Sequence, residues 1–175
     1  IKEYQGRSLR ILDIGTGTGC IAIALARFLP GASVEGIDFD EKIINLAKEN
    51  SYRNKVKVNF YVMDILNEEL LEGYDLIVSN PPYVRESEKK TMHGNVTEFE
   101  PAEALFVADD DPLIFYRKIT EKSLKALKTG GRLFFEINEY LSNEIRGLIE
   151  NYGFTEIVIK NDINDKPRMI KATKI

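Results

Sequence analysis

Short runs of apolar residues alternate along this chain with longer stretches that are apolar on one side or, at 20–28, nearly all round. The short runs are typical of strands in a buried sheet, and the longer stretches are typical of helices that pack on such a sheet. Strands are therefore expected at 9–14, 33–38, 56–62, 74–79 and 132–137. Helices are expected at 20–28, 41–50, 112–127 and 142–152.

The last apolar runs, 154–160 and 169–173, have only a loop between them, and strands joined in this way pair in antiparallel fashion. The preceding strands alternate with helices, which favours a parallel sheet with helices on each face. The pattern predicts an α/β fold: a doubly wound, mostly parallel, Rossmann-like seven-stranded sheet with helices on both faces and an antiparallel C-terminal strand pair. The interval 81–111 shows little periodicity and is expected to be a long loop.

Composition narrows the classes of protein to which the chain can belong. Its 175 residues have the length of one domain, and we expect residues 1–175 to form a single domain. The 24 basic and 28 acidic residues give a net charge of −4, which disfavours a protein that binds a phosphate backbone unaided. Cys20 is the only cysteine and His93 the only histidine, which excludes a disulfide framework, a cysteine-rich zinc site and a multi-histidine metal site. No apolar run is long enough to span a bilayer, and a cytoplasmic location is expected.

The first candidate site lies between the first strand and the first helix, where the sequence is Asp13-Ile14-Gly15-Thr16-Gly17-Thr18-Gly19. Glycines at such a junction let the backbone approach a ligand closely, and the start of the helix offers unpaired N–H groups. The spacing G-x-G-x-G differs from the G-x-G-x-x-G of dinucleotide-binding proteins. The plain alternative is a tight connection without a ligand.

Two further aspartates follow the next two strands. Asp38 ends the second strand, where a carboxylate can accept hydrogen bonds from the hydroxyls of a ribose. Its alternative role is the N-cap of the helix at 41–50, for which Asp40 is better placed. Asp64 follows the third strand and can accept a hydrogen bond from an adenine amino group, or it is an ordinary loop carboxylate. All these acids, including Asp13, are expected to converge at one edge of the sheet.

Asn80-Pro81-Pro82-Tyr83 comes directly after the fourth strand. The two prolines stiffen the chain and remove two N–H donors, so that carbonyl groups point outward without local partners. The Asn80 side chain beside such a carbonyl forms a compact pair of acceptors for a planar –NH₂ group. A purely structural turn would require neither the asparagine nor the tyrosine.

Together, the glycine-rich loop, Asp38, Asp64 and the Asn80–Tyr83 tetrad resemble the class I S-adenosylmethionine-dependent methyltransferases that act on a planar nitrogen. Further stretches are similar to the HemK-type release-factor glutamine-N5 methyltransferases, and the likeness covers essentially the whole chain. These stretches are Phe99-Glu100-Pro101-Ala102-Glu103-Ala104-Leu105, Phe115-Tyr116-Arg117-Lys118-Ile119, Phe135-Glu136-Ile137 and Lys166-Pro167-Arg168-Met169-Ile170.

The resemblance implies methyl transfer from S-adenosylmethionine, with S-adenosylhomocysteine as product, to the side-chain amide nitrogen of a glutamine in a peptide chain release factor. It implies that Asn80 and Pro81 are catalytic because they hold the amide, and that Pro82 and Tyr83 complete the substrate pocket. The cofactor-binding residues that it implies are Asp13, Gly15, Thr16, Gly17, Thr18, Gly19, Asp38, Asp64, Ile65 and Asn80. We expect a monomer that uses no metal and binds neither nucleic acid nor a membrane. Family members also carry an N-terminal helical domain that contacts the release factor, and we expect it to be missing before Ile1.

Several residues depart from the pattern of that family. The stretch 107–113 stands where the family has a glycine-rich segment. Asn138 and Asp165 stand where glycine is usual, and Leu141 stands where glutamine is usual. These departures leave open the geometry of the lid and the rim of the site. Two alternatives therefore stay open: an enzyme that methylates an adenine or guanine amino group of nucleic acid, and a non-catalytic cofactor-binding domain. The glycine spacing and the tetrad disfavour a nicotinamide oxidoreductase.

Three residue types that often carry chemistry are expected to have plain roles here. His93 is expected to be an exposed loop residue rather than a base. The run Asp109-Asp110-Asp111 is expected to be a solvated turn rather than a cation site. Cys20 is expected to be a small core residue of a buried helix.

Overall fold

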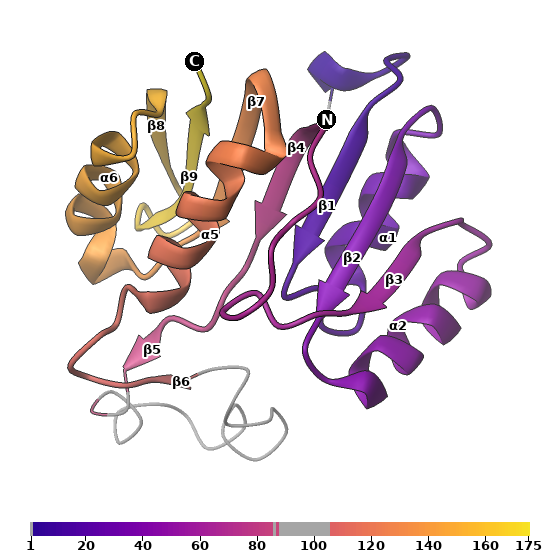
Figure 1. The fold of residues 1–175 in the computed structure, drawn as a ribbon, viewed down its shortest axis with the longest axis horizontal. Coiled ribbons are helices and arrows are strands. Elements are labelled where there is room, and N and C mark those ends of the chain that lie inside the picture. Colours follow the sequence, from indigo (N-terminus) through magenta and orange to yellow (C-terminus); the bar gives the residue numbers. More distant parts are fainter. Residues whose placement is uncertain (1, 86, 88–105) are drawn as a thin grey trace.

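A computed structural model describes residues 2–85, 87 and 106–175 of the chain. Its main feature is a seven-stranded sheet flanked by helices (Figure 1). Across this sheet the strands follow in the order β3 (Asn59–Val62), β2 (Ser33–Asp38), β1 (Arg10–Ile14), β4 (Tyr74–Ser79), β7 (Leu127–Glu136), β9 (Pro167–Thr173) and β8 (Thr155–Asn161). The helices are α1 (Cys20–Phe28), α2 (Glu41–Arg53), α5 (Ile114–Ala126) and α6 (Ser142–Asn151), with short 3₁₀ turns η1 (Lys2–Tyr4) and η3 (Glu139–Leu141).

The strand directions confirm the predicted fold class. β3, β2, β1, β4 and β7 run parallel, whereas β9 pairs antiparallel with both β7 and β8. Several boundaries differ from the prediction by a few residues, those of β3 and β7 among them. β3 starts at Asn59 rather than at 56, because Val56 and Val58 pack against the core without pairing in the sheet. β7 already starts at Leu127, the residue at which the preceding helix was expected to end.

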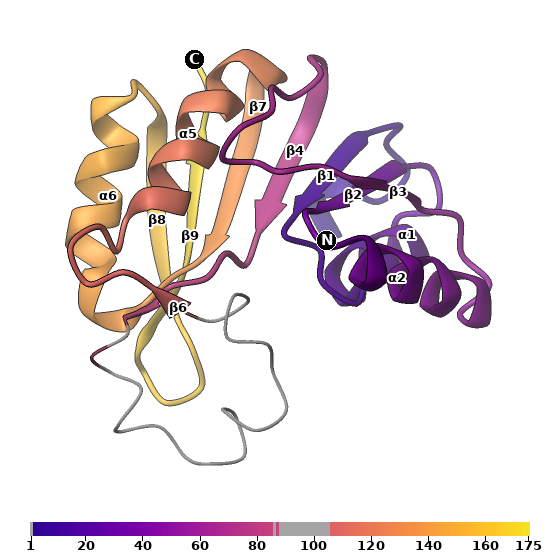
Figure 2. The ribbon, with the colours of Figure 1, turned by 60° about the horizontal axis from the view of Figure 1, so that its bottom comes forward.

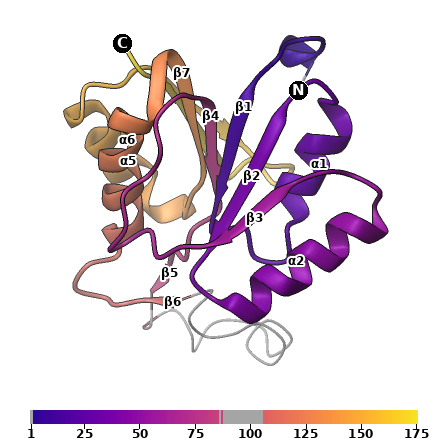
Figure 3. The same ribbon diagram turned by 45° about the vertical axis from the view of Figure 1, so that its right-hand side comes forward.

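Each face of the sheet carries its own hydrophobic core. Successive side chains of a strand point to opposite faces, so Ile11 lies in one core and Leu12 in the other. Helices α1 and α2 pack in the core that contains Ile11, through residues such as Ile44. Helices α5 and α6 pack in the core that contains Leu12, through residues such as Ile119. Figures 2 and 3 show the two helix pairs on opposite sides of the sheet. The predicted helix layer on each face is thereby confirmed.

Helix α1 is less buried than its sequence predicts. Only Ala22 and Ile23 of this helix are buried, and the expectation that Cys20 is a core residue is wrong, because Cys20 is exposed. The helix covers one face of the sheet from outside, so its far side meets solvent although it is apolar. Cys20 is also its first residue, at the end of the helix that follows the glycine-rich loop.

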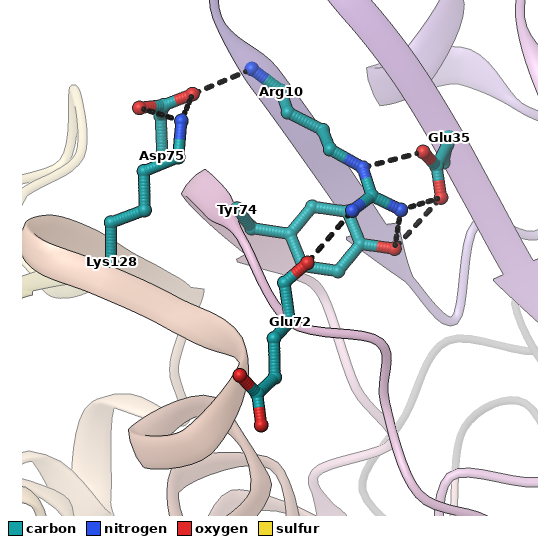
Figure 4. A network of polar contacts seen from close by, with 6 residues as sticks. All are labelled: Arg10, Glu35, Glu72, Tyr74, Asp75 and Lys128. Atoms are coloured by element: carbon teal, nitrogen blue, oxygen red, sulfur yellow. Dashed lines mark hydrogen bonds and ion pairs between the residues drawn. The ribbon is translucent and has the colours of Figure 1, made fainter.

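A network of polar side chains joins four strands at the edge of the sheet opposite their carboxyl ends (Figure 4). Glu35 on β2 is buried, and its carboxylate accepts hydrogen bonds from Arg10 Nε at 2.9 Å and from Tyr74 Oη at 2.7 Å. The Arg10 guanidinium also lies over the Tyr74 ring, 4.3 Å from its centroid. Lys128 at the start of β7 donates to Asp75 on β4 at 2.8 Å. These contacts hold β1, β2, β4 and β7 in register.

The interval 81–111, expected to be a loop, is described only at its two ends. There Val84–Arg85 (β5) and Phe106–Val107 (β6) pair in parallel as a small separate sheet, which periodicity did not predict because two-residue strands carry no pattern. None of the described helices combines the length and the apolar character that a membrane-spanning helix requires.

Candidate functional site

The carboxyl ends of the parallel strands bring the candidate residues to one edge of the sheet. Ile14 at the end of β1 is in register with Ile37 of β2 and with Ser79 of β4, and Asp38 is in register with Val62 of β3. The residues that follow these strands therefore start from neighbouring positions. The predicted convergence of Asp13, Asp38 and Asp64 at this edge is confirmed, and Asn80 at the end of β4 lies there too.

The glycine-rich loop turns sharply from β1 into α1 and is attached to β2. Gly15 has a φ of +67° and Gly19 a φ of +86°, backbone conformations that side chains other than glycine rarely adopt. Gly19 has a second constraint, because an added Cβ would lie 3.1 Å from Ile23 Cδ1. Between them, Thr16 N donates to Ile37 O at 2.9 Å, and Gly17 N donates to Asp38 Oδ2 at 3.0 Å. The loop thus keeps a fixed shape at the candidate site.

Asp13 lies beneath this loop and is only 1% exposed. Its Oδ2 accepts hydrogen bonds from Thr16 Oγ1 at 2.7 Å and from Ala22 N at 3.1 Å, so that it connects the loop with the first turn of α1. Burial raises the pKa of Asp13 to about 7, although the bonds from Thr16 and Ala22 act in the opposite direction. The second oxygen, Oδ1, is buried without a hydrogen-bond partner among the described residues. A buried acceptor of this kind is one that a ligand or a water molecule completes.

Asp38 and Asp40 have separate tasks. Asp40 is the N-cap of α2, and its Oδ1 accepts from Lys42 N at 2.7 Å. The alternative that Asp38 caps this helix is therefore excluded. Asp38 instead faces the glycine-rich loop, where it accepts from Gly17 N, and its other oxygen accepts from Asp40 N at 3.3 Å. A carboxylate has about four acceptor positions, so these two contacts leave capacity for a ligand hydroxyl.

Asp64 shapes the turn that follows β3. Its Oδ1 accepts from Leu66 N at 2.9 Å, and its Oδ2 accepts from Asn67 Nδ2 at 2.7 Å. Asp64 is partly exposed, whereas the neighbouring Ile65 side chain is buried in the core under α5. Asp64 is therefore both a turn residue and an acceptor at the candidate edge.

The Asn80–Tyr83 tetrad leaves β4 beside the glycine-rich loop. Ser79 Oγ donates to Ile14 O at 2.8 Å, which joins the ends of β4 and β1. An added Cβ on Gly15 would lie 4.0 Å from the main-chain oxygen of Asn80, so the loop and the tetrad are in close proximity. The Asn80 side chain is exposed and makes no hydrogen bond to any residue that the structure describes, whereas Pro81 is buried. An acceptor oxygen of Asn80 is thus available at the surface of the edge.

Tyr83 is held by residues of β7 and the turn after it. Its phenol donates to Glu136 Oε1 at 2.9 Å, and its main-chain oxygen accepts from Asn138 Nδ2 at 3.2 Å. Burial and the Glu136 carboxylate raise the pKa of Tyr83 to about 12. Glu136 was part of a family-like stretch, but no pattern in the sequence indicated that it would meet Tyr83. Asn138, which replaces a usual glycine, is buried and supports the tetrad rather than disturbing it.

The other candidates have structural roles where they are described. Asp109 accepts from Ser87 Oγ at 2.7 Å and Asp111 pairs with Arg117, so the acidic run is divided among separate partners, and the described residues contain no cluster that could hold a metal. Tyr116 of the Phe115–Ile119 stretch is fully buried and donates to the main-chain oxygen of Glu136 at 3.0 Å. His93 and the stretch Phe99–Leu105 lie outside the described residues.

A surface hollow of about 850 Å³ lies elsewhere, at the amino ends of β2 and β3. It is open and polar, and basic side chains such as Arg27, Lys55 and Lys57 line it. None of the candidate residues contributes to it, so it does not belong to the site at the carboxyl edge.

Comparison with known proteins links the chain to methyltransferases. Residues 2–102 match the family described as methyltransferase small domain. Among curated proteins, a release factor glutamine methyltransferase of Flavobacterium psychrophilum is 52% identical over 173 residues, which are 98% of this chain and 61% of that protein. One from Bacteroides thetaiotaomicron is 42% identical over 94% of this chain and 60% of its own length. The chain thus spans about three fifths of these relatives.

Solved structures share the fold at low sequence identity. A methyltransferase from Pyrococcus furiosus superimposes with a TM-score of 0.71 at 20% identity, covering 99% of this chain and 78% of that one. A ribosomal protein L11 methylase from Lactobacillus delbrueckii gives a TM-score of 0.67 at 20% identity, covering 97% and 72%. These similarities establish the architecture of the sheet and its helices.

Proposed function

Because the chain belongs to the methyltransferase small domain family, we propose that it transfers a methyl group from S-adenosylmethionine to the side-chain amide nitrogen of a glutamine in a peptide chain release factor. The observation that carries this proposal is the proximity of Gly15 in the glycine-rich loop to the Asn80 carbonyl at the start of the tetrad. A cofactor loop and an amide-binding segment then share one edge of the sheet. The names of the two curated relatives support the choice of substrate.

The residues of the carboxyl edge fit S-adenosylmethionine in their chemistry. Asp38 has spare acceptor capacity for the ribose hydroxyls, and Asp64 for the adenine amino group, beside the apolar Ile65. The glycine-rich loop from Gly15 to Gly19 permits close approach of the methionine part. The buried, unpartnered Oδ1 of Asp13 beneath this loop is consistent with a polar ligand or its water above it.

The tetrad supplies what an amide nitrogen needs to react. Its lone pair is delocalised into the carbonyl group, so it is a poor nucleophile that must be held and polarised. We infer that Asn80 Oδ1 and the Pro81 carbonyl accept the two N–H groups of the glutamine amide, while Pro82 and Tyr83 form the wall of the pocket. Fixed orientation of two reactants can lower a barrier by up to roughly 7–11 kcal/mol.

When bound, S-adenosylmethionine supplies an electrophilic methyl group on its sulfonium. The amide nitrogen would take up this methyl group, S-adenosylhomocysteine would be left as the product, and the nitrogen would release one proton to water. Asn80 and Pro81 keep the nitrogen in place through this step. Glu136 keeps the Tyr83 ring in place through its 2.9 Å hydrogen bond.

The proposal is tested by incubating the 175-residue chain with methyl-labelled S-adenosylmethionine and a purified bacterial release factor. Mass spectrometry of the digested factor should locate the label on the side chain of one glutamine, and Asn80→Ala should slow the labelling by about two orders of magnitude. Label on an adenine or guanine of added RNA or DNA, with binding that weakens steeply with salt, would favour a nucleic-acid substrate instead. Tight cofactor binding without label on any substrate would indicate a non-catalytic domain.

A further inference from the structure

Lys122 is an unusual residue because it is a lysine that is only 6% exposed. Its ammonium group donates to the main-chain oxygen of Ile65 at 2.7 Å and also to that of Glu68. Among the described residues it forms no ion pair with a carboxylate. A buried cation is costly unless its donors are satisfied, so these two carbonyl groups account for its presence in the core.

The carbonyl groups that Lys122 binds belong to the connection between β3 and β4, residues 63–73. This connection contains turns but no helix of its own, and it returns across the sheet beside α5 (Figures 1 and 3). Helix α5 contacts this connection at three points. Lys122 binds its first part, Lys125 forms an exposed ion pair with Glu69 at 3.8 Å, and Ala126 O accepts from Gly73 N at 2.8 Å.

Lys122 acts next to the residue to which the adenine contact is assigned. Asp64 directly precedes Ile65, and its carboxylate accepts from Leu66 N and Asn67 Nδ2 within the same turn. The ammonium group of the buried Lys122 donates hydrogen bonds to Ile65 O and Glu68 O, and so contacts this turn from its core side. The orientation of the Asp64 carboxylate therefore depends on a backbone that Lys122 holds from the core.

We propose that Lys122 is a positioning residue for the adenine side of the cofactor site, acting through the Asp64 turn. This inference rests on the proposed function, in which Asp64 accepts the adenine amino group. Lys122 does not touch the cofactor in this arrangement. Its effect is confined to the half of the cofactor that Asp64 recognises.

The test measures binding of two ligands to the full chain by calorimetry: S-adenosylhomocysteine and S-inosylhomocysteine, in which a carbonyl oxygen replaces the adenine amino group. The wild-type chain should prefer the adenosyl ligand at least tenfold, because Asp64 cannot accept from a carbonyl. Lys122→Met should lower the affinity for the adenosyl ligand about tenfold and leave the affinity for the inosyl ligand within twofold. Lys125→Met, on the same helix and facing the same connection, is the matched control and should leave both within twofold.

A purely structural role gives a different result. If Lys122→Met weakens both ligands equally, or neither, Lys122 does not position Asp64 and the inference is wrong. Adding Lys122→Met to Asp64→Ala should cause no further loss of affinity for the adenosyl ligand. If the two substitutions instead lower this affinity independently, the inference is wrong. Should Lys122→Met fail to fold, Lys122→Gln retains an uncharged –NH₂ donor group and should lose about threefold in its preference for the adenosyl ligand. An unchanged preference would contradict the inference. Failure of the wild-type chain to bind either ligand would instead refute the proposed function.

Discussion

The phenol of Tyr83 donates a 2.9 Å hydrogen bond to Oε1 of Glu136 and so joins the segment after β4 to the end of β7. The main-chain oxygen of the same Glu136 accepts from Tyr116 on α5. One acidic residue thereby connects the tetrad, a strand and a helix. The proposed wall of the amide pocket is held from the side by elements that lie far from it in the sequence.

This contact predicts the titration of Tyr83. Burial and the Glu136 carboxylate raise its pKa to about 12, and removing the negative charge by Glu136→Gln should lower the pKa toward its ordinary value near 10. The pKa is measured by ultraviolet titration, with Tyr83→Phe subtracted to isolate this phenol from the other tyrosines. An unchanged pKa in Glu136→Gln would mean that the two side chains are not in contact.

Asp38 and Asp40 provide a matched pair of variants. Asp38→Ala should weaken the binding of S-adenosylhomocysteine at least tenfold, about 1.4 kcal/mol, because it removes the proposed acceptor for the ribose hydroxyls. Asp40→Ala should instead lower the free energy of unfolding by ~1 kcal/mol, because it removes the N-cap of α2, and should leave the affinity within twofold. Calorimetry and urea unfolding measure the two quantities. Equal losses of affinity in both variants would refute the division of roles.

Asn80 is expected to affect the chemical step far more than the binding of cofactor. Asn80→Ala should lower kcat by about two orders of magnitude, roughly 2.7 kcal/mol, because the amide would lose one of the two acceptors proposed for it. The affinity for S-adenosylhomocysteine should stay within a few fold. Asn80→Asp keeps an acceptor oxygen and should retain more activity than Asn80→Ala. Steady-state kinetics on a release factor compares them, and equal kcat values for all three proteins would contradict the assignment.

Asp13 should make stability depend on pH. Its pKa is raised to about 7 in the folded chain from 3.8, so the folded state holds a proton that the unfolded state has lost. The contribution is fully present below pH 4 and is lost as the pH rises from 4 to 7. Relative to Asp13→Asn, the wild-type chain should therefore lose up to ~4 kcal/mol of unfolding free energy over this range.

Chemical unfolding of both proteins at several pH values measures this difference. In the difference between the two proteins, the contributions of the other carboxylates to the pH dependence of the unfolding free energy cancel, because they are common to both. A difference that does not change between pH 4 and 7 would show that Asp13 is ionised throughout and that its Oδ1 has a partner.

Much of the arrangement at the carboxyl edge follows from the pattern of residues along the chain. Short apolar runs fix the strands, alternation with helices fixes their parallel direction, and the residues directly after parallel strands must meet at one edge. This reasoning places Asp38, Asp64 and Asn80 together. It also favours Asp40 over Asp38 as the cap of α2, which the structure confirms.

The errors have physical reasons too. Apolar residues on all sides of 20–28 suggested a buried helix, but burial depends on what covers the outer face, and nothing described covers Cys20. The alternation at 56–62 signals which side chains face a core and not which backbone groups pair. Val56 and Val58 therefore face the core before β3 begins at Asn59.

By itself, the sequence determined the succession along the chain of the helices and the strands of the main sheet, the edge at which the polar residues meet and the chemistry of those residues, because periodicity acts locally along the chain. Only the tertiary structure decided which distant side chains support them. Glu136 meets Tyr83 across 53 positions and Lys122 meets Ile65 across 57. Such contacts depend on the packing of whole elements against one another, and a buried charge or a hydrogen bond between them leaves no periodic signal in the sequence.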